Sequence, residues 1–330
     1  MGDLRCSLPR YFAILEGEQA AHYLNCKYIP VTYDSSTSTE KLWKVHDAAI
    51  TTMDLSDELP SQSLLDLKIE LAHRIFQNCH FCERRCAVDR RTAKGTCHVQ
   101  QSLIASEFLH IGEERVLIPS DTIFFSGCTF QCVFCQNWKI SQQICGKYTE
   151  PATLATMIDK RKHQGSLNVN WVGGDPTPNL VYILEALKHC TANLPQIWNS
   201  NMYCSQETMK LLNGIIDVYL TDFKYGNDEC AQRLSKVNDY MSIVQRNHRI
   251  AYHTAEMIIR HLVMPNHITC CSKPILKWIS KNVADAPVNI MAQYRPEYQA
   301  KDYKDIDRPV SLEEISAIKQ YANTIELHGL

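Results

Sequence analysis

The sequence predicts an α/β fold, a partial, TIM-like barrel of six β/α units that follows an N-terminal cysteine-rich module. Three observations lead to this prediction. From about residue 121 onward, short β-rich runs alternate with amphipathic helical stretches, as in parallel β/α units. Polar or glycine-rich residues follow nearly every candidate strand. Cysteines gather in two tight groups, one before the first unit and one at its head.

Six segments have the composition of β-strands. They are residues 122–125, 169–172, 196–198, 218–221, 258–263 and 288–292. Helical patterns lie between them at residues 152–163, 179–189, 206–212, 229–237 and 275–283. Six units are fewer than the eight of a closed barrel, so we expect an open (β/α)6 barrel.

The 330 residues are long enough for one large core and an appended module. We expect an N-terminal extension, partly helical, over residues 1–75 and a four-cysteine metal-binding module over 76–120. The barrel then covers 121–300, and a helical tail covers 301–330. Within the extension, the apolar spacing of residues 63–76 predicts a packing helix that leads into the first cysteine group. Residues 1–60 suggest no role.

Composition excludes several kinds of partner. Lys and Arg number 34 and Asp and Glu 36, a net charge of −2 at pH 7, so no overall basic field favours nucleic acid. No apolar stretch reaches membrane length and the first residues lack a secretory signal, which predicts a cytoplasmic protein away from membranes. The 15 cysteines include two groups with metal-ligand spacing, as expected in a reducing compartment.

The features that follow the candidate strands should meet in space, because barrel enzymes build their active sites at the carboxyl ends of the strands. These features are the loop after residue 125, Gly173-Gly-Asp-Pro176, Asn199-Ser-Asn201, Asp222-Phe-Lys224, Pro265-Asn-His267 and Gln293-Tyr-Arg295.

The loop after residue 125 carries Cys128, Cys132 and Cys135. Three thiolates on a [4Fe–4S] cluster leave one iron open for a substrate or cofactor, so this spacing indicates chemistry rather than electron storage. Gly127 lets the chain turn off the strand, and Phe134 supplies an apolar wall beside the last ligand. A zinc or redox cysteine cluster is the alternative.

The upstream group is Cys79, Cys82, Cys86 and Cys97. Four thiolates can close a tetrahedral zinc site or hold a second iron–sulfur cluster, and the sequence does not decide between them. Either metal would be structural, because four protein ligands leave no open position. The surrounding basic residues would offset thiolate charge, face solvent, or dock an acidic partner or an electron donor. They are Arg84, Arg85, Arg90, Arg91 and Lys94.

The Cys-x3-Cys-x2-Cys pattern, with an aromatic residue before the third cysteine, resembles the radical S-adenosylmethionine (SAM) superfamily. Residues 122–142 further resemble the homologues of pyruvate formate-lyase activating enzyme, and the likeness covers most of residues 75–315. The resemblance implies that SAM binds the open iron of a [4Fe–4S] cluster and is cleaved to methionine and a 5′-deoxyadenosyl radical. That radical would abstract hydrogen from a substrate, with a protein glycine as one candidate.

The resemblance also implies roles at the other strand ends. Gly173 and Gly174 begin a string like the Gly-Gly-Glu-Pro motif that holds the SAM amino group, although Asp175 stands where that motif has Glu. Asp222 and Lys224 share a strand face and resemble the Asp-x-Lys segment that lines the SAM region; a salt bridge at the barrel rim is the alternative.

Other candidates come from the residue types themselves. Asn199 and Asn201 could bond ribose hydroxyls, although at least one should be a satisfied turn residue. Arg260, an inward charge, needs an anionic partner, which a SAM carboxylate would supply. His261 should be structural, and His267 is the better candidate to line the site. Six further cysteines stay outside the site, with Cys145 a weak alternative ligand or radical relay. They are Cys145, Cys190, Cys204, Cys230, Cys270 and Cys271.

We therefore expect a radical SAM enzyme with a catalytic [4Fe–4S] cluster at Cys128, Cys132 and Cys135. It would take electrons from reduced flavodoxin or a ferredoxin-like donor and act on an unidentified substrate, with a protein among the candidates. A non-enzymatic iron–sulfur or zinc protein for electron transfer or docking is the rival interpretation.

Overall fold

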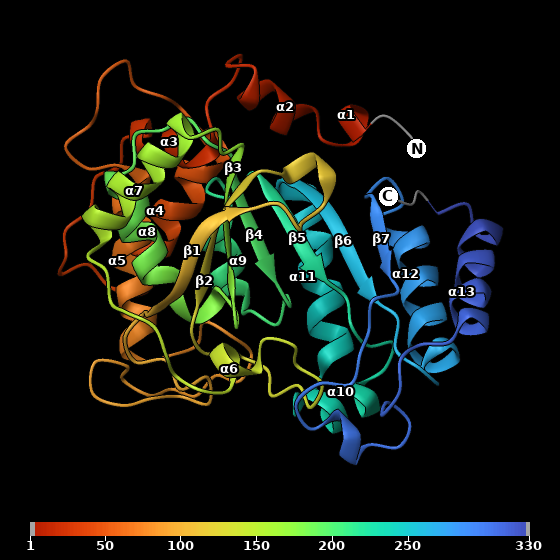
Figure 1. Cartoon of the computed structure of the whole chain (residues 1–330). Helices are drawn as coiled ribbons and strands as arrows, with labels where there is room; N and C mark the ends of the chain where they lie inside the picture. The colour runs from red at the N-terminus through yellow and green to blue at the C-terminus, as the bar shows by residue number, and fades with distance from the viewer. Residues whose placement is uncertain (1–3, 328–330) are drawn as a thin grey trace.

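The computed structural model describes residues 4–327; the first three residues of the predicted extension and the last three of the predicted tail lie outside it. Its centre is a seven-stranded sheet in the order β1-β2-β3-β4-β5-β6-β7 (Figure 1). The strands are β1 (Ile104–His110), β2 (Ser120–Phe125), β3 (Asn168–Gly173), β4 (Gln196–Ser200), β5 (Val218–Asp222), β6 (Glu256–Leu262) and β7 (Val288–Met291).

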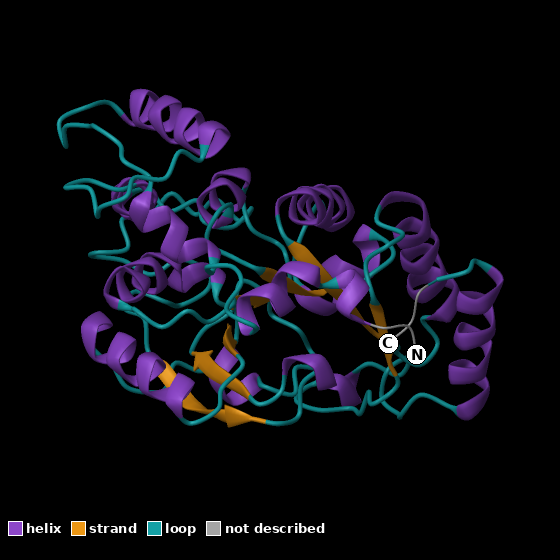
Figure 2. Cartoon of the chain, turned by 90° about the horizontal axis from the view of Figure 1, so that it is seen from above, coloured by secondary structure: helices purple, strands orange, loops and turns teal. Residues whose placement is uncertain are grey.

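Strands β2 to β7 pair in parallel and in chain order, and they are the six strands that the sequence predicts. The sheet does not close, which confirms the partial barrel. Seen from above, the strands follow an arc with helices around its outer side (Figure 2).

Strand β1 was not expected, because it lies within the predicted metal-binding module and no helix connects it to a parallel neighbour. It pairs antiparallel with β2, so that Leu109 lies opposite Asp121. Its side chains are mostly half-buried, and such an edge strand lacks the apolar run that marks the buried strands.

The helices of the β/α units are α7 (Pro151–His163), α8 (Leu180–His189), α9 (Gln206–Leu212), α10 (Asp228–Ser235), α11 (Tyr240–Thr254) and α12 (Lys273–Asn282). Five of them match the predicted patterns. Helix α11 was missed because its inner face includes Asn247 and His248, two buried polar residues that interrupt the apolar periodicity.

The N-terminal extension folds as helices α3 (His22–Tyr28), α4 (Thr39–Thr52) and α5 (Leu64–Gln77), which gather beside α7 and α8 (Figure 1). Helix α5 is the packing helix predicted before the first cysteine group. It begins with a capping box, in which the Ser63 hydroxyl accepts from the Asp66 amide and the Asp66 carboxylate accepts from the Ser63 amide.

Two short helices, α1 (Leu4–Ser7) and α2 (Pro9–Leu15), lie at the amino ends of the parallel strands (Figure 1). Tyr11 of α2 joins a separate core with Ile197, Leu220 and Ile258 from the strands. The Glu256 carboxylate accepts from the Tyr11 amide at 2.9 Å and so caps α2. This end of the barrel is filled, which leaves the carboxyl ends of the strands for a site.

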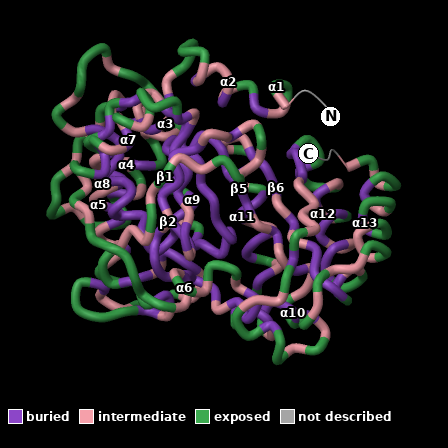
Figure 3. The backbone as a smooth tube through the Cα atoms, in the orientation of Figure 1, coloured by how far each residue is buried: buried purple, intermediate pink, exposed green. Residues whose placement is uncertain are grey.

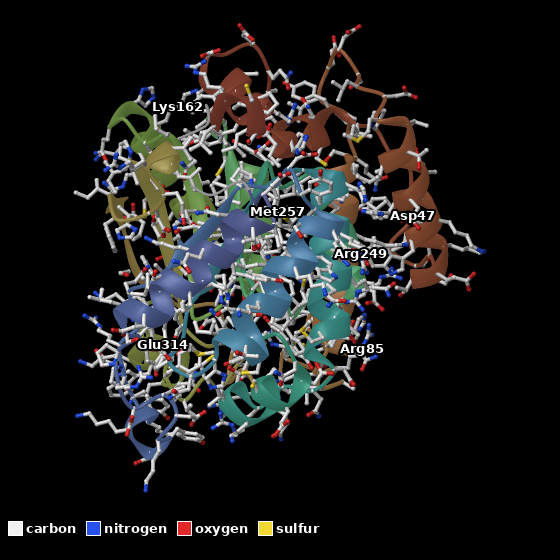
Figure 4. The ribbon with its side chains drawn as sticks, turned by 90° about the vertical axis from the view of Figure 1, so that its right-hand side faces the viewer. Asp47, Arg85, Lys162, Arg249, Met257 and Glu314 are labelled. Carbon is white, nitrogen blue, oxygen red and sulfur yellow. The ribbon has the colours of Figure 1, made fainter. Side chains whose placement is uncertain are left out.

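The distribution of buried and exposed residues follows this arrangement of sheet and helices. The backbone of the sheet is mostly buried, and exposure concentrates on the loops and outer helices (Figure 3). Lys162 and Arg249 point outward at the surface, whereas Met257 of β6 is buried (Figure 4). The C-terminal helix α13 (Leu312–Thr324) lies beside α12. No helix among the described residues is long and apolar enough to cross a membrane.

Candidate functional site

A cavity of about 290 Å³ opens at the carboxyl ends of the parallel strands, and we call it the strand-end cavity. It brings together residues from the cysteine loop, here residues 126–137, and from β3 to β7 or the loops that follow them. The lining residues are Cys128, Phe130, Cys132, Phe134, Cys135, Gln136, Asn137, Val172, Gly173, Gly174, Asn199, Ser200, Asn201, Asp222, Lys224, Arg260, Leu262, Met291 and Gln293.

The cysteine loop leaves β2 at Gly127, where φ is +86° and a side chain could not fit. A Cβ atom there would lie 2.2 Å from Val99 Cγ2 and 2.7 Å from the Cys97 carbonyl oxygen. Farther along, the loop is bonded to α10: the Gln131 amide donates to the Ser235 carbonyl at 3.0 Å. The loop is therefore fixed between the four-cysteine module and α10.

Each of the three loop cysteines has a hydrogen-bond partner at its sulfur. Cys132 Sγ accepts from the Ser235 hydroxyl at 2.9 Å, and Cys128 Sγ accepts from the Phe130 amide at 3.3 Å. Cys135 Sγ lies 3.1 Å from Ser141 Oγ. Such donors stabilise charge on a metal-bound sulfur. Sequence reasoning missed both serines, because neither has a fixed spacing from the cysteine it contacts.

Burial raises the pKa of the Cys128 thiol well above its usual range and that of Cys132 to about 12. Thiols in such surroundings stay protonated near neutral pH unless a cation takes the place of the proton. Among the described residues, no fourth cysteine lines the cavity.

Gly173 and Gly174 both line the cavity, and both also allow β3 to approach the cysteine loop. A Cβ atom on Gly173, whose φ is +128°, would lie 2.2 Å from the Phe125 backbone. One on Gly174 would lie 2.0 Å from the Gly127 carbonyl oxygen. The Gly-Gly pair is thus required by backbone packing, apart from any contact with a ligand.

Asp175 is not among the residues that line the cavity, and it lies fully buried behind the wall. Its carboxylate accepts from the hydroxyls of Thr129 at 2.6 Å and Ser200 at 3.0 Å. Burial raises its pKa, although these hydrogen bonds oppose the shift. In this position Asp175 ties the cysteine loop to β4.

Asp222, Lys224 and Arg260 form an ionic network in the wall of the cavity. Asp222 Oδ2 accepts from Lys224 Nζ at 2.6 Å, and Asp222 Oδ1 accepts from Arg260 Nε at 2.9 Å. Burial alone would raise the pKa of Asp222, but the two cations outweigh it and lower that pKa to about 2. The carboxylate is therefore ionised at any physiological pH.

Arg260 has its anionic partners within the chain. Besides Asp222, it donates to Glu113 Oε2 at 3.2 Å and to Asn199 Oδ1. Burial raises the pKa of Glu113. The sequence did not indicate Glu113 as a site residue, because it precedes β2 and so lies outside the six parallel units. By contrast, the Lys224 ammonium has three donors and gives one of them to Asp222.

Asn201 is a turn residue beside the first thiol. Its Oδ1 accepts from the Tyr203 amide at 2.9 Å, and its Nδ2 donates to Thr129 Oγ1 at 2.9 Å and lies 4.0 Å from Cys128 Sγ. As the sequence suggested, a satisfied turn accounts for one of the two asparagines.

The two histidines near β6 lie away from the cavity. His261 is buried, with Nδ1 against the Phe223 carbonyl and Nε2 against Ser272 Oγ, both at 2.8 Å, and burial lowers its pKa to about 4. His267 is also buried but faces Cys230, Cys270 and Cys271 rather than the cavity where we expected it. Cys145 is exposed and does not line the cavity either.

The four-cysteine module packs against the cysteine loop. Cys97 touches the Gly127 turn, and Arg84 Nε donates to the Thr129 carbonyl at 2.7 Å. Arg90 is fully buried, and one terminal nitrogen of its guanidinium has no hydrogen-bond partner among the described residues. Arg90 opposes the rise in the pKa of Cys97 that burial causes. A buried cation beside Cys97 fits a charge partner for a metal-bound thiolate.

Two other basic residues of the module are more exposed and paired with acids. Arg85 is 46% exposed and pairs with Glu83 and Glu207, and Arg91 pairs with Asp89. Arg85 and Arg91 thus face solvent, as one of the interpretations had it. Arg90 is instead buried, as expected of a residue that offsets the charge of the thiolates.

Comparison with known proteins gives a family. A family model described as the radical SAM superfamily matches residues 122–268. The protein MJ0674 of Methanocaldococcus jannaschii, named as uncharacterized, is 48% identical over 333 residues, which cover 97% of this chain and 98% of that protein.

Several solved structures are similar to this chain at low identity. Methylornithine synthase (PylB) is 14% identical with a TM-score of 0.45, over 95% of this chain and 76% of that one. SuiB of Streptococcus suis bound to S-adenosylmethionine is 14% identical with a TM-score of 0.43, over 62% of this chain and 47% of SuiB. A domain of a pyruvate-formate lyase-activating enzyme from Bacteroides vulgatus is 14% identical with a TM-score of 0.35, over 56% of this chain and 94% of that domain.

Proposed function

Because the chain belongs to the radical SAM superfamily, an enzyme family that uses a [4Fe–4S] cluster and SAM, we propose that Cys128, Cys132 and Cys135 hold the cluster and that the strand-end cavity binds SAM. The observation that carries this proposal is that the three thiols and the ionic network of Asp222, Lys224 and Arg260 line one cavity. When bound, the cluster supplies an electron that cleaves SAM and yields a radical.

The donor set fits such a cluster. Three buried or half-buried thiols face the cavity, each sulfur has a hydrogen-bond partner, and the described residues offer no fourth cysteine there. The same cavity carries amide, carboxylate and ammonium groups that match the polar groups of SAM.

Within the cavity we assign Lys224 the contact with the SAM carboxylate. Arg260 is already bonded to Asp222, Glu113 and Asn199, so its role is to hold these groups in place. Lys224 keeps two donors beyond the one given to Asp222. Gly173, Gly174, Asn201 and Phe134 would shape the remaining wall, and Asp175 would position the cysteine loop from behind.

The reaction beyond SAM cleavage is proposed on resemblance alone. We propose hydrogen abstraction from a substrate in the manner of an activating enzyme, with a protein glycine as candidate, in the cytoplasm and with reduced flavodoxin or a ferredoxin-like protein as electron donor. We propose a structural metal, zinc or a second cluster, at Cys79, Cys82, Cys86 and Cys97.

The test is SAM cleavage by the anaerobically reconstituted protein. With reductant and SAM, the wild type should release 5′-deoxyadenosine, which chromatography quantifies. Cys128→Ala should abolish release, because it removes a ligand of the cluster. Cys190→Ala, which removes a buried thiol elsewhere, should leave release unchanged. An intact cluster that binds SAM but yields no 5′-deoxyadenosine would contradict the proposal and favour a non-enzymatic iron–sulfur protein.

The assignment of Lys224 has its own measurement. Lys224→Met should retain the iron content of the wild type but bind SAM roughly 10-fold more weakly or worse, because a hydrogen bond to a charged group is worth about 1.5–3 kcal/mol. Lys162→Met, at the surface, should bind SAM like the wild type. Equal SAM affinity in both variants would remove Lys224 from the site.

A further inference from the structure

We propose a mononuclear zinc site outside the strand-end cavity, formed by Cys230 of α10 and by His267, Cys270 and Cys271, which follow β6. The four ligand atoms all lie within 4.8 Å of one another. None of the four residues lines the strand-end cavity. The proposal therefore does not depend on the one made for SAM.

The distances match a tetrahedral zinc ion. His267 Nδ1 lies 3.6 Å from Cys230 Sγ, 3.4 Å from Cys270 Sγ and 3.6 Å from Cys271 Sγ. Cys270 Sγ lies 3.9 Å from Cys271 Sγ. Zn–S bonds of about 2.3 Å and Zn–N bonds of about 2.0–2.1 Å at tetrahedral angles require N···S separations of about 3.6 Å and S···S separations of about 3.8 Å.

The histidine is oriented as a metal ligand. His267 Nε2 lies 2.9 Å from Asp305 Oδ2, and a carboxylate accepts, so the imidazole proton belongs on Nε2. The lone pair of Nδ1 then points at the three sulfurs. Asp305 is itself held by Arg233, which donates to its Oδ1 at 3.1 Å. A carboxylate behind the histidine is the usual outer support of a zinc ligand.

The backbone around the histidine is fixed as well. The amide of Asn266, the preceding residue, donates to Glu314 Oε1 at 2.6 Å, so α13, on which Figure 4 labels Glu314, holds the loop in place. His267, Cys230 and Cys271 are buried, whereas Cys270 is exposed and gives a metal ion access from solvent.

Hydrogen bonding alone does not account for the cluster. A neutral imidazole with its proton on Nε2 has one acceptor, and that acceptor can satisfy one thiol. Three thiols converge on it. A cation at their centre gives every one of the four groups a partner, and a set of three sulfurs and one imidazole nitrogen is a common zinc set. Four protein ligands make the site structural.

The site would hold α10 at its first turn. The last turn of the same helix supports the cysteine loop: Ser235 donates its hydroxyl to Cys132 Sγ, and the Leu234 carbonyl accepts from the Val133 amide at 2.9 Å. Figure 1 shows α10 at the carboxyl end of the barrel, on the same side as α6. Zinc at one end of the helix would therefore position the thiol ligands at the other end.

The first test is metal content of the full chain, purified from zinc-supplemented cells. Inductively coupled plasma mass spectrometry should find one equivalent of zinc fewer in His267→Ala and in Cys271→Ser than in the wild type. Cys190→Ala is the control, since it removes a buried thiol that belongs to none of the three proposed ligand sets, and its zinc content should equal that of the wild type. Unchanged zinc in both ligand variants, or a wild type without zinc, would overturn the proposal.

A second measurement needs only the wild type, so it stands even where a variant fails to fold. X-ray absorption at the zinc edge should show sulfur neighbours together with the outer-shell scattering of an imidazole ring. The four-cysteine module, if it holds zinc, contributes sulfur alone, so an all-sulfur zinc shell would contradict the site.

Discussion

Ser235 lies at the end of a short relay of hydroxyl groups that finishes on a cysteine of the proposed cluster. The Tyr225 hydroxyl lies 2.5 Å from Ser235 Oγ, and Ser235 in turn donates to Cys132 Sγ at 2.9 Å. All three side chains are buried. A hydrogen bond to the sulfur of a cluster favours the more negative, reduced state, so this serine should raise the reduction potential.

Ser235→Ala should lower the potential of the cluster by roughly 60 mV, because a hydrogen bond to a charged group is worth about 1.5 kcal/mol and a one-electron couple shifts about 59 mV per tenfold change. Potentiometric titration followed by electron paramagnetic resonance measures the shift. Ser242→Ala, which removes a hydroxyl exposed on α11, should leave the midpoint where it is. A potential unchanged in Ser235→Ala would mean that the hydroxyl does not donate to the bound sulfur.

At the scale of elements, the β1–β2 pair contains a carboxyl group, that of Asp121, that has no cation of its own among the described residues. Arg161 of α7 bonds the Glu107 carboxylate through two nitrogens, at 2.5 and 2.9 Å, and its Nε lies 3.7 Å from Asp121 Oδ1. Asp121 is fully buried. Burial first, and then the neighbouring Glu107 carboxylate, raises the pKa of Asp121 to about 8. One cation thus serves two carboxyl groups, and Asp121 is protonated in the fold at neutral pH.

This acid predicts a pH dependence. The folded pKa exceeds the value of 3.8 expected for an unfolded chain, so the folded state binds more protons between these values. The stabilisation is complete below about pH 4 and is lost as the pH rises through about 8. Asp121→Asn, which stays neutral, should therefore melt higher than the wild type at pH 8.5.

The two proteins should differ least near pH 4.5. Circular dichroism melts at pH 4.5, 6.5 and 8.5 test this, with a shift of on the order of 2 °C expected for each kcal/mol. A difference between Asp121→Asn and wild type that stays constant with pH would show that Asp121 does not titrate as described.

Individual elements also show how much of the fold could be predicted from the sequence. The parallel strands were predictable because each is a short apolar run with turn residues at its end, and the same argument placed Gly173, Asn199 and Asp222 at one edge. Helix α11 was not. Its buried Asn247 side chain donates to the Cys204 carbonyl, a tertiary contact that a periodicity cannot show, and its buried His248 bonds the Val244 carbonyl of the same helix.

At the scale of the whole molecule, the two ends of the barrel differ: one is filled by a helix and the other is open. The amino end is filled by α2, whose Tyr11 hydroxyl accepts from Asn168 Nδ2 at 3.0 Å and donates to the Val116 carbonyl at 3.2 Å. The carboxyl end opens into the strand-end cavity. The sequence did not indicate that α2 fills this end of the barrel, because its partners in the strands lie more than 100 residues away.

Tyr11→Ala should therefore lower the free energy of unfolding by roughly 3–5 kcal/mol, the usual cost of removing a buried aromatic ring. SAM affinity should not change, because the ring packs at the opposite end of the strands from the cavity. Phe12→Ala, a neighbour that is only half-buried, should cost less. Denaturant titration and a binding isotherm measure the two properties. A weakened SAM affinity in Tyr11→Ala would show that the two ends of the barrel are coupled.

Long separation in sequence likewise hid the Cys230, His267, Cys270 and Cys271 cluster. Residues 230 and 267 belong to different β/α units, and only the turn after β6 brings them together. The two groups recognised from the sequence have their ligands within one loop each, so their spacing was visible.

Helix α10 is held at both ends, and this has a thermodynamic consequence. If zinc binds its first turn and the iron–sulfur cluster binds the loop that its last turn supports, each metal favours the same ordered helix. The two bindings are then linked, and linkage is reciprocal: whatever factor zinc adds to the affinity for the cluster, the cluster adds to the affinity for zinc. Iron loss and zinc loss should accompany each other, although the two metals share no ligand.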